Sequence, residues 1–247
     1  AAAAHTSNSV LHMSDDEGYD YPSDSSSEEH YETEKTVDVE TTGPDDVEAQ
    51  VDSVFDLLPA DLSGVDSMDA AKRADINEAL LTLERMNPTA DPAFSPLLNG
   101  VWTLRYAGGY SNEWAMPSPT RQLALFLYSG GYSPGLFALS LAQKLPKALV
   151  ELGELEISIS REQPRIEANV PVKFLGGSEN EVAVSARLDV DSSVRLTETY
   201  ESATVLGNSI DLPQAVQYSR DLYVTYVDED LLVVRDASGV PEVLVRK

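Results

Sequence analysis

The feature that most constrains this sequence is a change in the spacing of its apolar residues at Val101. Before this point apolar residues recur every three or four positions, whereas Trp102, Leu104 and Tyr106 alternate with polar neighbours. Alternation is typical of a β-strand, so we expect these three side chains to share one face. Eight further segments read as strands between Gly, Pro, Asn and Asp turns: Gln122–Ser129, Leu152–Arg161, Arg165–Phe174, Glu181–Val190, Val194–Glu201, Asp221–Val227, Asp230–Asp236 and Pro241–Arg246. Short strands at this spacing predict a closed antiparallel barrel or a sandwich.

Two amphipathic helices are expected before the strands. Apolar residues follow one another at steps of three and four in 45–58 and again in 67–86, and Pro59 and Pro88 end the two patterns. The turn between them contains Gly64. We therefore predict a helical hairpin that leads into the strands.

The first part of the chain differs from the rest in charge. Residues 1–69 contain 19 Asp and Glu and a single basic residue, Lys35, so they carry −18 of the net charge of −25. Self-repulsion and few apolar side chains predict disorder for a segment such as 14–42. The chain starts with four alanines and no methionine, as it would after removal of a targeting peptide, although an artificial start would look the same.

Composition excludes several classes of function. A sequence pI near 4.2 argues against nucleic acid as a partner and against electrostatic docking to anionic lipids. The chain has no cysteine, which excludes disulfides and thiolate sites. Its histidines, His5, His12 and His30, all precede the expected folded part, which therefore has no imidazole for general-base or zinc chemistry. We expect no enzyme, no cofactor and no metal.

Two local features have a functional and an ordinary interpretation. No residue in 122–143 is charged, but Gly130, Gly131, Pro134 and Gly135 divide this run, so a core strand followed by a loop or short helix is favoured over a membrane-contacting portal. The three adjacent carboxylates at 228–230 are favoured as a solvated turn over a cation site, because Ca²⁺ loops place their ligands at alternate positions.

Three stretches carry a resemblance to a known family. They are Leu83–Thr89 with Leu97–Tyr106 at the opening of the strand region, Arg195–Glu201 in its middle, and Tyr223–Asp236 with Gly239 and Val243–Val245 at its end. Their order and separation are similar to those of plastid lipid-associated proteins, the fibrillin family. The resemblance covers roughly residues 45–247.

The resemblance implies a mainly β fold, a lipocalin-like antiparallel β-barrel. From the charge and the apolar spacing described above, we expect this barrel to be preceded by a short helical hairpin and a disordered acidic leader. The corresponding boundaries are 1–44 for the leader, 45–96 for the hairpin and linker, and 97–247 for the barrel. The resemblance also implies a chloroplast protein at thylakoids or plastoglobules, and no catalytic residues. In lipocalins a Gly-x-Trp and an arginine close one end of the barrel, and Gly100, Trp102 and Arg235 resemble that set.

An apolar barrel either fills itself or holds one hydrophobic ligand. Candidates for the ligand-binding lining are Leu104, Tyr106, Phe126, Tyr128, Phe137, Ile157, Ile159, Phe174 and Tyr223, and ordinary core packing is the competing interpretation for each. The expected partner is a prenylquinone, carotenoid or other apolar plastid lipid. The alternatives are a scaffold that binds a thylakoid enzyme or photosynthetic complex and, least favoured, an enzyme.

Overall fold

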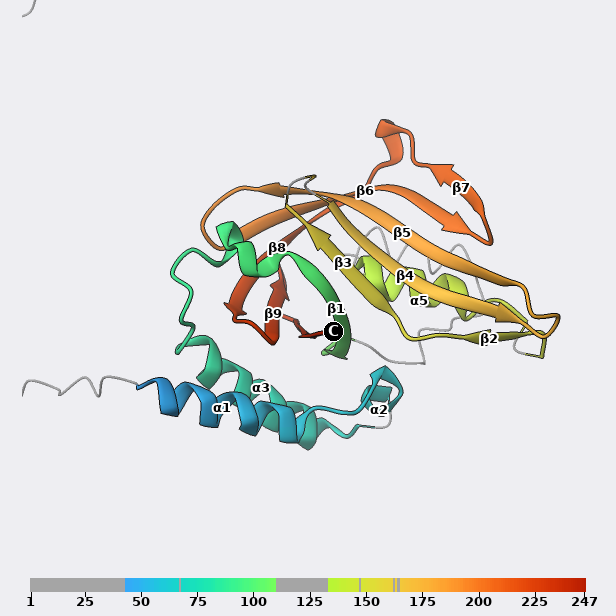
Figure 1. The fold of residues 1–247 in the computed structure, drawn as a ribbon. Helices are drawn as coiled ribbons and strands as arrows, with labels where there is room; N and C mark the ends of the chain where they lie inside the picture. The colour runs from blue at the N-terminus through green and yellow to red at the C-terminus, as the bar shows by residue number, and fades with distance from the viewer. Residues whose placement is uncertain (1–42, 67, 110–132, 147, 162, 164) are drawn as a thin grey trace, which may run out of the picture. The chain divides into compact units, whose positions relative to one another are not determined.

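Eight antiparallel strands close into a barrel in the part of the chain that the computed structural model describes, residues 43–247 without 67, 110–132, 147, 162 and 164 (Figure 1). Neighbouring strands follow the order β4-β3-β1-β10-β9-β8-β6-β5, and β5 pairs with β4 to complete the ring. This confirms the lipocalin-like barrel rather than the sandwich. The strands are β1 (Gly100–Ala107), β3 (Glu156–Ser160), β4 (Arg165–Phe174), β5 (Glu179–Val190), β6 (Arg195–Val205), β8 (Ser219–Val227), β9 (Leu231–Asp236) and β10 (Pro241–Arg246).

Two short strands extend the barrel at its edges. β2 (Val150–Leu152) pairs with β4, and β7 (Asn208–Asp211) pairs with β6. The expected strand 152–161 is therefore divided into β2 and β3, whereas β4 and β10 have their expected bounds. All four residues of β7 are exposed, so no burial pattern marked this strand in the sequence. The expected strand 122–129 lies outside the described residues.

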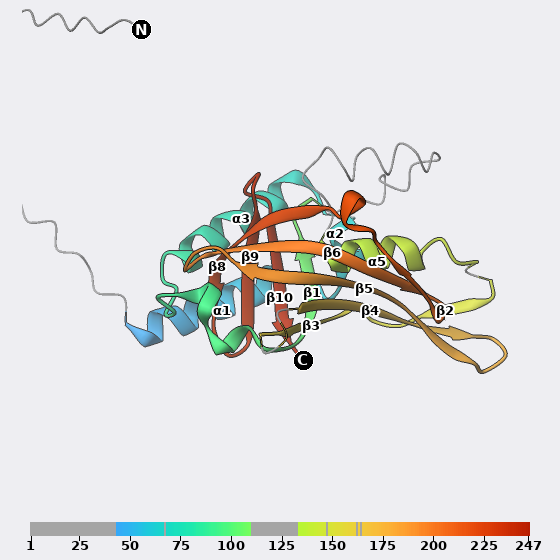
Figure 2. The same cartoon turned by 90° about the horizontal axis from the view of Figure 1, so that it is seen from above.

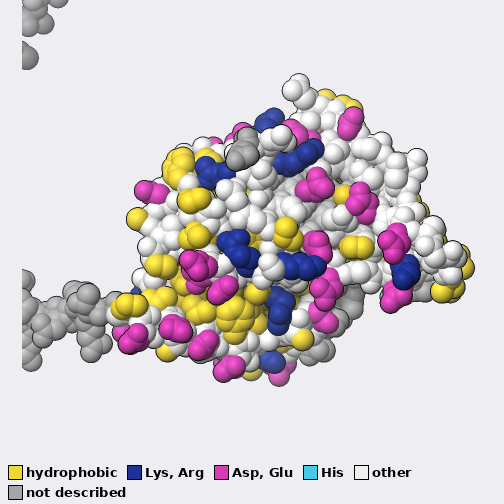
Figure 3. Space-filling view, viewed as in Figure 1, with side chains coloured by type: hydrophobic (Ala, Val, Ile, Leu, Met, Phe, Trp, Pro, Cys, Tyr) yellow, Lys and Arg dark blue, Asp and Glu magenta, His cyan; other side chains and the backbone are white. Residues whose placement is uncertain are grey.

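A layer of helices covers one outer side of the barrel (Figures 1 and 2). The predicted hairpin is present as α1 (Pro44–Leu57) and α3 (Ala70–Glu84), with the short α2 (Leu62–Asp66) in the connection. Val54, Ile76, Leu80 and Leu83 are buried in this layer. Figure 3 shows acidic side chains along its outer side, where α1 exposes Asp45, Asp46, Glu48, Asp52 and Asp56. The described residues also include the single-turn 3₁₀ helices η1 (Pro92–Phe94), η2 (Pro96–Leu98) and η4 (Gln214–Val216).

The helical layer explains why β9 and β10 read as continuous apolar runs. Leu232 and Val234 face the barrel interior, while Leu231 and Val233 lie on the outer face, and all four are buried. A strand that is buried on both faces loses the alternation that marks a half-exposed strand. The helical layer also reaches the neighbouring strands, where α2 contacts β1 and α3 contacts β8.

Two bulges turn tyrosines from the interior to the helical layer. Leu104 pairs with Leu244 but Tyr106 pairs with Val243, so β1 contains one extra residue, Arg105. A bulge of this kind shifts the following side chain to the other face. Tyr106 therefore does not share a face with Trp102 and Leu104, contrary to our expectation from their alternation. A second bulge in β8, between Val224 and Tyr226, acts in the same way.

Helix α5 (Pro134–Ala142) lies in the mouth of the barrel. It contacts β4, β5 and β6, and a Cβ on Gly135 would meet the side chains of Leu155 and Ile157. Since Ile157 faces the interior, α5 packs against the inner face of the strands (Figure 2). No helix among the described residues is long and apolar enough to cross a membrane.

Candidate functional site

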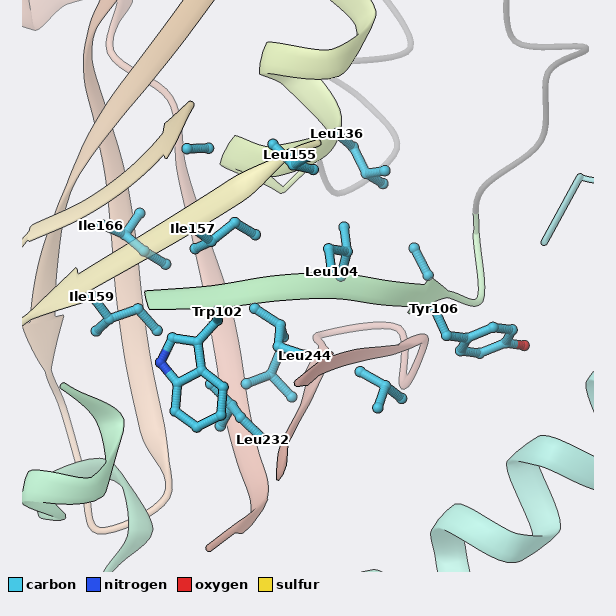
Figure 4. Packing of buried hydrophobic residues seen from close by; sticks show 14 of the residues in the cluster. Trp102, Leu104, Tyr106, Leu136, Leu155, Ile157, Ile159, Ile166, Leu232 and Leu244 are labelled. Carbon is cyan, nitrogen blue, oxygen red and sulfur yellow. The ribbon is translucent and has the colours of Figure 1, made fainter. Parts of the chain in front are cut away.

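A small cavity lies at the centre of the barrel, and we refer to it as the barrel cavity. It extends from Leu98, beside the first strand, to Ser133 and Pro134 at the start of α5. Its volume is about 30 Å³, enough for one or two water molecules but not for a lipid. The other lining residues are Ile157, Ile159, Ile166, Leu188, Leu196, Glu198, Arg220, Leu222, Val224, Leu232, Val234, Glu242 and Leu244. The side chains of the strands and the start of α5 therefore leave little space in the interior. Figure 4 shows Leu136 of α5 beside Leu155 and Ile157.

Trp102 closes the end of the barrel opposite α5. Its indole is fully buried and donates a hydrogen bond to the Leu98 carbonyl at 3.1 Å. The guanidinium of Arg246 lies 4.1 Å from the centre of the indole ring, and it donates to the carbonyls of Leu97 at 2.6 Å and Asn99 at 2.9 Å. Gly100 has a φ of +148°, and a Cβ there would collide with the Arg246 guanidinium. Trp102, Arg246 and Gly100 therefore form the closure.

Arg235, the arginine proposed from the sequence, is not the partner of Trp102. It lies on the outer face of β9, because its neighbour Val234 faces inward. Its side chain donates to Glu84 on α3 at 2.7 Å and to Asn77 at 3.1 Å. Arg235 therefore joins the helical layer to the barrel. The side chain of Arg246 points into the barrel instead. Arg246 lies two residues after the inward-facing Leu244, and it pairs with Trp102 between β10 and β1.

A buried charged cluster forms part of the cavity wall. Arg220 on β8 donates to Glu198 of β6 through Nε at 2.7 Å, and to Glu242 of β10 through Nη1 at 3.1 Å. The three residues are 6%, 0% and 8% exposed in that order. Within the described part of the chain, Glu198 Oε1 has no hydrogen-bond partner. The cluster therefore presents an unsatisfied carboxyl oxygen in a cavity that is otherwise almost entirely apolar.

Burial dominates the electrostatics of this cluster. It raises the pKa of Glu198, and Arg220 opposes the shift only in part. The pKa of Tyr200 is also well above its ordinary value because the phenol is desolvated. For Arg220, desolvation lowers the pKa, but the two carboxylates outweigh it and leave the guanidinium charged. A permanent cation between two carboxyl groups, one of them reluctant to ionise, is the charge state that this interior favours.

Aromatic rings connect the cluster to α5. Tyr200 lies two residues after Glu198 on the inner face of β6, and its ring contacts Phe137 of α5 edge-on with 6.2 Å between centroids. The ring of Tyr218 lies 5.9 Å from Tyr200 on the other side. These contacts hold α5 in the mouth of the barrel above the cluster.

The nine residues proposed to line a ligand site do not lie together. Ile157 and Ile159 line the barrel cavity. Leu104 and Phe174 lie on the inner faces of β1 and β4 without lining it, and Phe137 lies on α5. Tyr106 and Tyr223 are on the outer face, Tyr106 through the bulge and Tyr223 because it lies between the inward-facing Leu222 and Val224. Phe126 and Tyr128 fall outside the described residues.

Sequence reasoning missed the charged cluster, although a signal for it was present. Glu198 lies between Leu196 and Tyr200 in the inward phase of its strand, and Arg220 precedes Leu222 in the same way. A charged residue in the apolar phase of a strand indicates either an exposed strand or a buried ion pair. Pairing these residues required the barrel register, which the sequence does not provide.

Metal binding has no support among the described residues, where no group of three or more histidine or acidic side chains could hold an ion. At the acidic turn, Asp228 Oδ1 accepts hydrogen bonds from the backbone amides of Asp230 and Leu231, at 2.8 and 2.7 Å. This carboxylate therefore stabilises the turn between β8 and β9.

Comparisons with known proteins agree with this geometry. The PAP_fibrillin family model matches residues 57–245. Probable plastid-lipid-associated protein 9, chloroplastic, from Arabidopsis thaliana is 29% identical over 211 residues, covering 71% of this chain and 61% of that protein. Probable plastid-lipid-associated protein 13, chloroplastic, from the same plant is also 29% identical over 211 residues, covering 71% of this chain and 62% of that protein. The chain thus spans about three fifths of the length of these curated relatives. No solved structure matches the chain significantly.

Proposed function

The chain belongs to the plastid-lipid-associated protein (PAP/fibrillin) family, and from this premise we propose that its barrel binds and shields an apolar plastid lipid without catalysing a reaction. The observation that carries the proposal is the pairing of an apolar barrel interior with an apolar helix in its mouth. Both relatives are named chloroplastic plastid-lipid-associated proteins, which supports a chloroplast location and a lipid partner for this chain.

Helix α5 occupies the place that a lipid chain would take. Its nine residues, PGLFALSLA, include no charged side chain, and Leu136, Ala138 and Ala142 are buried against the strands. A helix that is apolar on all sides gains little from facing water. If α5 moves out, an acyl or prenyl chain can restore the same contacts at roughly 25 cal/mol for each Å² removed from water.

The displaced helix would need an apolar surface of its own. Outside the barrel, α5 would expose the apolar side chains that it now buries, which costs free energy in water but not in a lipid layer. The exchange is therefore favourable at the surface of a thylakoid membrane or plastoglobule. We infer that the protein takes up and releases its ligand there, and that the closed barrel is the form present in the aqueous phase.

A reversible lock of α5 tests this proposal. A Cβ at position 135 would lie 3.5 Å from Cγ1 of Ile157, which is close to where the sulfur of a cysteine at 157 would stand. Gly135→Cys with Ile157→Cys therefore brings the two sulfurs within reach of a disulfide bond, and the chain has no other cysteine to interfere. The same double variant in its reduced form is the matched control.

Both forms are incubated with vesicles made from total thylakoid lipid, purified again and extracted into organic solvent for mass spectrometry. We expect apolar lipid in the reduced form and at least about tenfold less in the oxidised form, since the lock keeps the barrel filled. Equal lipid in both forms would show that binding occurs outside the barrel. No lipid in the wild type or in either form of the variant would refute the lipid-binding function and favour the scaffold alternative.

A further inference from the structure

The charged cluster in the barrel wall contains more carboxyl groups than it needs to balance its cation. Among the described residues, Arg220 is the one cation between Glu198 and Glu242, and it donates one hydrogen bond to each carboxyl group. Glu198 Oε1 is left without a partner among the described residues, although the side chain is only 1% exposed. A buried polar atom without a partner costs free energy that a ligand can recover.

The geometry of the cluster selects against an anionic head group. A fatty-acid carboxylate in this cavity would need a cation whose charge is not already balanced, and Arg220 is paired with two carboxyl groups. A further negative charge beside Glu242 would be repelled in a site with little water to screen it. The cluster therefore differs from a fatty-acid site, in which an arginine without another ion-pair partner binds the carboxylate of the ligand.

A hydroxyl group fits the unpartnered oxygen in either protonation state of Glu198. If the carboxyl group is ionised, Oε1 needs a donor, and a hydroxyl supplies one; if it is protonated, a hydroxyl can still accept or donate. An ammonium group, which only donates, fits the ionised form alone, and a carbonyl fits the protonated form alone. A hydroxyl is also uncharged, so moving it from water into the apolar cavity costs less free energy than moving an ammonium or a carboxylate.

We propose that Glu198 is the head-group site of the barrel, and that it takes a neutral lipid with a free hydroxyl group in preference to a fatty acid of the same chain length. This inference rests on the proposed lipid-binding function and names the class of lipid. Tyr200 follows Glu198 on the inner face of β6 and contacts Phe137 of α5. The lipid chain would therefore extend from the head-group site toward the space that α5 now fills.

Three probes that share a sixteen-carbon chain separate the head group from the chain. The full-length protein is offered an equimolar mixture of hexadecan-1-ol, hexadecanoate and hexadecane at pH 8, and the retained amounts are measured by mass spectrometry after purification. We expect about tenfold more alcohol than hexadecanoate, because the carboxylate brings a negative charge to a site that already holds two carboxyl groups. The alcohol should also exceed the alkane, which lacks a head group.

Two variants with the same change in charge provide the control. Glu198→Gln should reduce the ratio of retained alcohol to retained alkane, because it alters the oxygen that faces the ligand. Glu242→Gln removes a carboxylate from the same cluster but leaves Glu198 Oε1 in place, so this ratio should persist. If either variant fails to fold, the comparison of the three probes on the wild type still decides the question.

The outcomes separate this inference from the function on which it rests. Equal retention of alcohol and hexadecanoate, preference for hexadecanoate, or equal retention of alcohol and alkane would overturn the assignment of Glu198 while leaving lipid binding intact. Retention of none of the three probes would overturn the assignment together with the lipid-binding function. A strong preference for the alcohol that is lost in Glu198→Gln and kept in Glu242→Gln would establish it.

Discussion

Replacing Arg246 by alanine tests whether this residue closes the barrel, and the structure allows its effect to be estimated. The side chain donates hydrogen bonds to the carbonyls of Leu97, Asn99 and Glu229 and stacks on the indole of Trp102. Because the guanidinium is partly exposed, each hydrogen bond contributes about 1 kcal/mol, and the cation–π contact about as much. Arg246→Ala should therefore lower the free energy of unfolding by about 3–4 kcal/mol.

Urea unfolding followed by circular dichroism measures this change. If the free energy of unfolding falls by about 2 kcal/mol for each molar increase in urea, the midpoint of the unfolding transition should fall by about 1.5–2 M. Arg165→Ala is the matched control, since Arg165 is exposed at the start of β4 and makes no side-chain hydrogen bond or ion pair with the described residues, and it should change stability by less than about 0.5 kcal/mol. Arg246→Lys should lie between the two, because an ammonium cannot reach the three carbonyls together. A loss below about 1 kcal/mol in Arg246→Ala would refute the closure.

Three further predictions follow from the site. Gly100→Ala should destabilise the protein by roughly 1–3 kcal/mol in the same assay, because it forces a non-glycine residue to a φ of +148° against the Arg246 guanidinium; unchanged stability would contradict the positioning of that group. Burial raises the pKa of Glu198 above its ordinary value of 4.5, so this carboxyl group stays protonated to a higher pH in the folded state than in the unfolded state. The contribution of Glu198 to stability should thus fall as pH rises above that value, and the slope of stability against pH should differ between wild type and Glu198→Gln; identical slopes would contradict the shift. Phe137→Ala should loosen α5 by removing its contact with Tyr200 and so raise the lipid retained from vesicles, whereas a lower retention would indicate that Phe137 contacts the ligand.

The barrel could be predicted from the sequence because alternation survives in most of its strands. β4 shows it through ten residues, with Ile166, Ala168, Val170 and Val172 buried and their neighbours partly or fully exposed, and its bounds were predicted correctly. β9 and β10 were found although both of their faces are buried, because Gly, Asp and Pro mark their ends. Local rules therefore sufficed where each strand has its own pattern and its own turn signals.

The errors at the site have one physical origin: the sequence does not show which side chains of a strand face the barrel interior and which face outward. One extra residue in β1 places Tyr106 outside the barrel, and nothing in the residues around Arg105 indicates that bulge. Arg235 and Arg246 each lie near the end of an apolar strand, and only the inward position of Leu244 shows that Arg246 is the one that faces Trp102. A shift of one residue exchanges the two faces of a strand, so a site inside a barrel depends on the register of every strand that contributes to it.

If the barrel binds a lipid as proposed, the helix that fills its mouth lowers the apparent affinity. If α5 occupies the interior in all but a small fraction of molecules, the apparent dissociation constant equals the intrinsic one divided by that fraction, so a closed state favoured by about 2.7 kcal/mol weakens binding about 100-fold. The contacts of α5 with Tyr200 and with Ile157 then determine affinity as much as the contacts of the lipid do. A lipid surface that accepts α5 removes this cost, because it stabilises the open state. On the proposed function, lipid binding should therefore be strong at such a surface and weak in water.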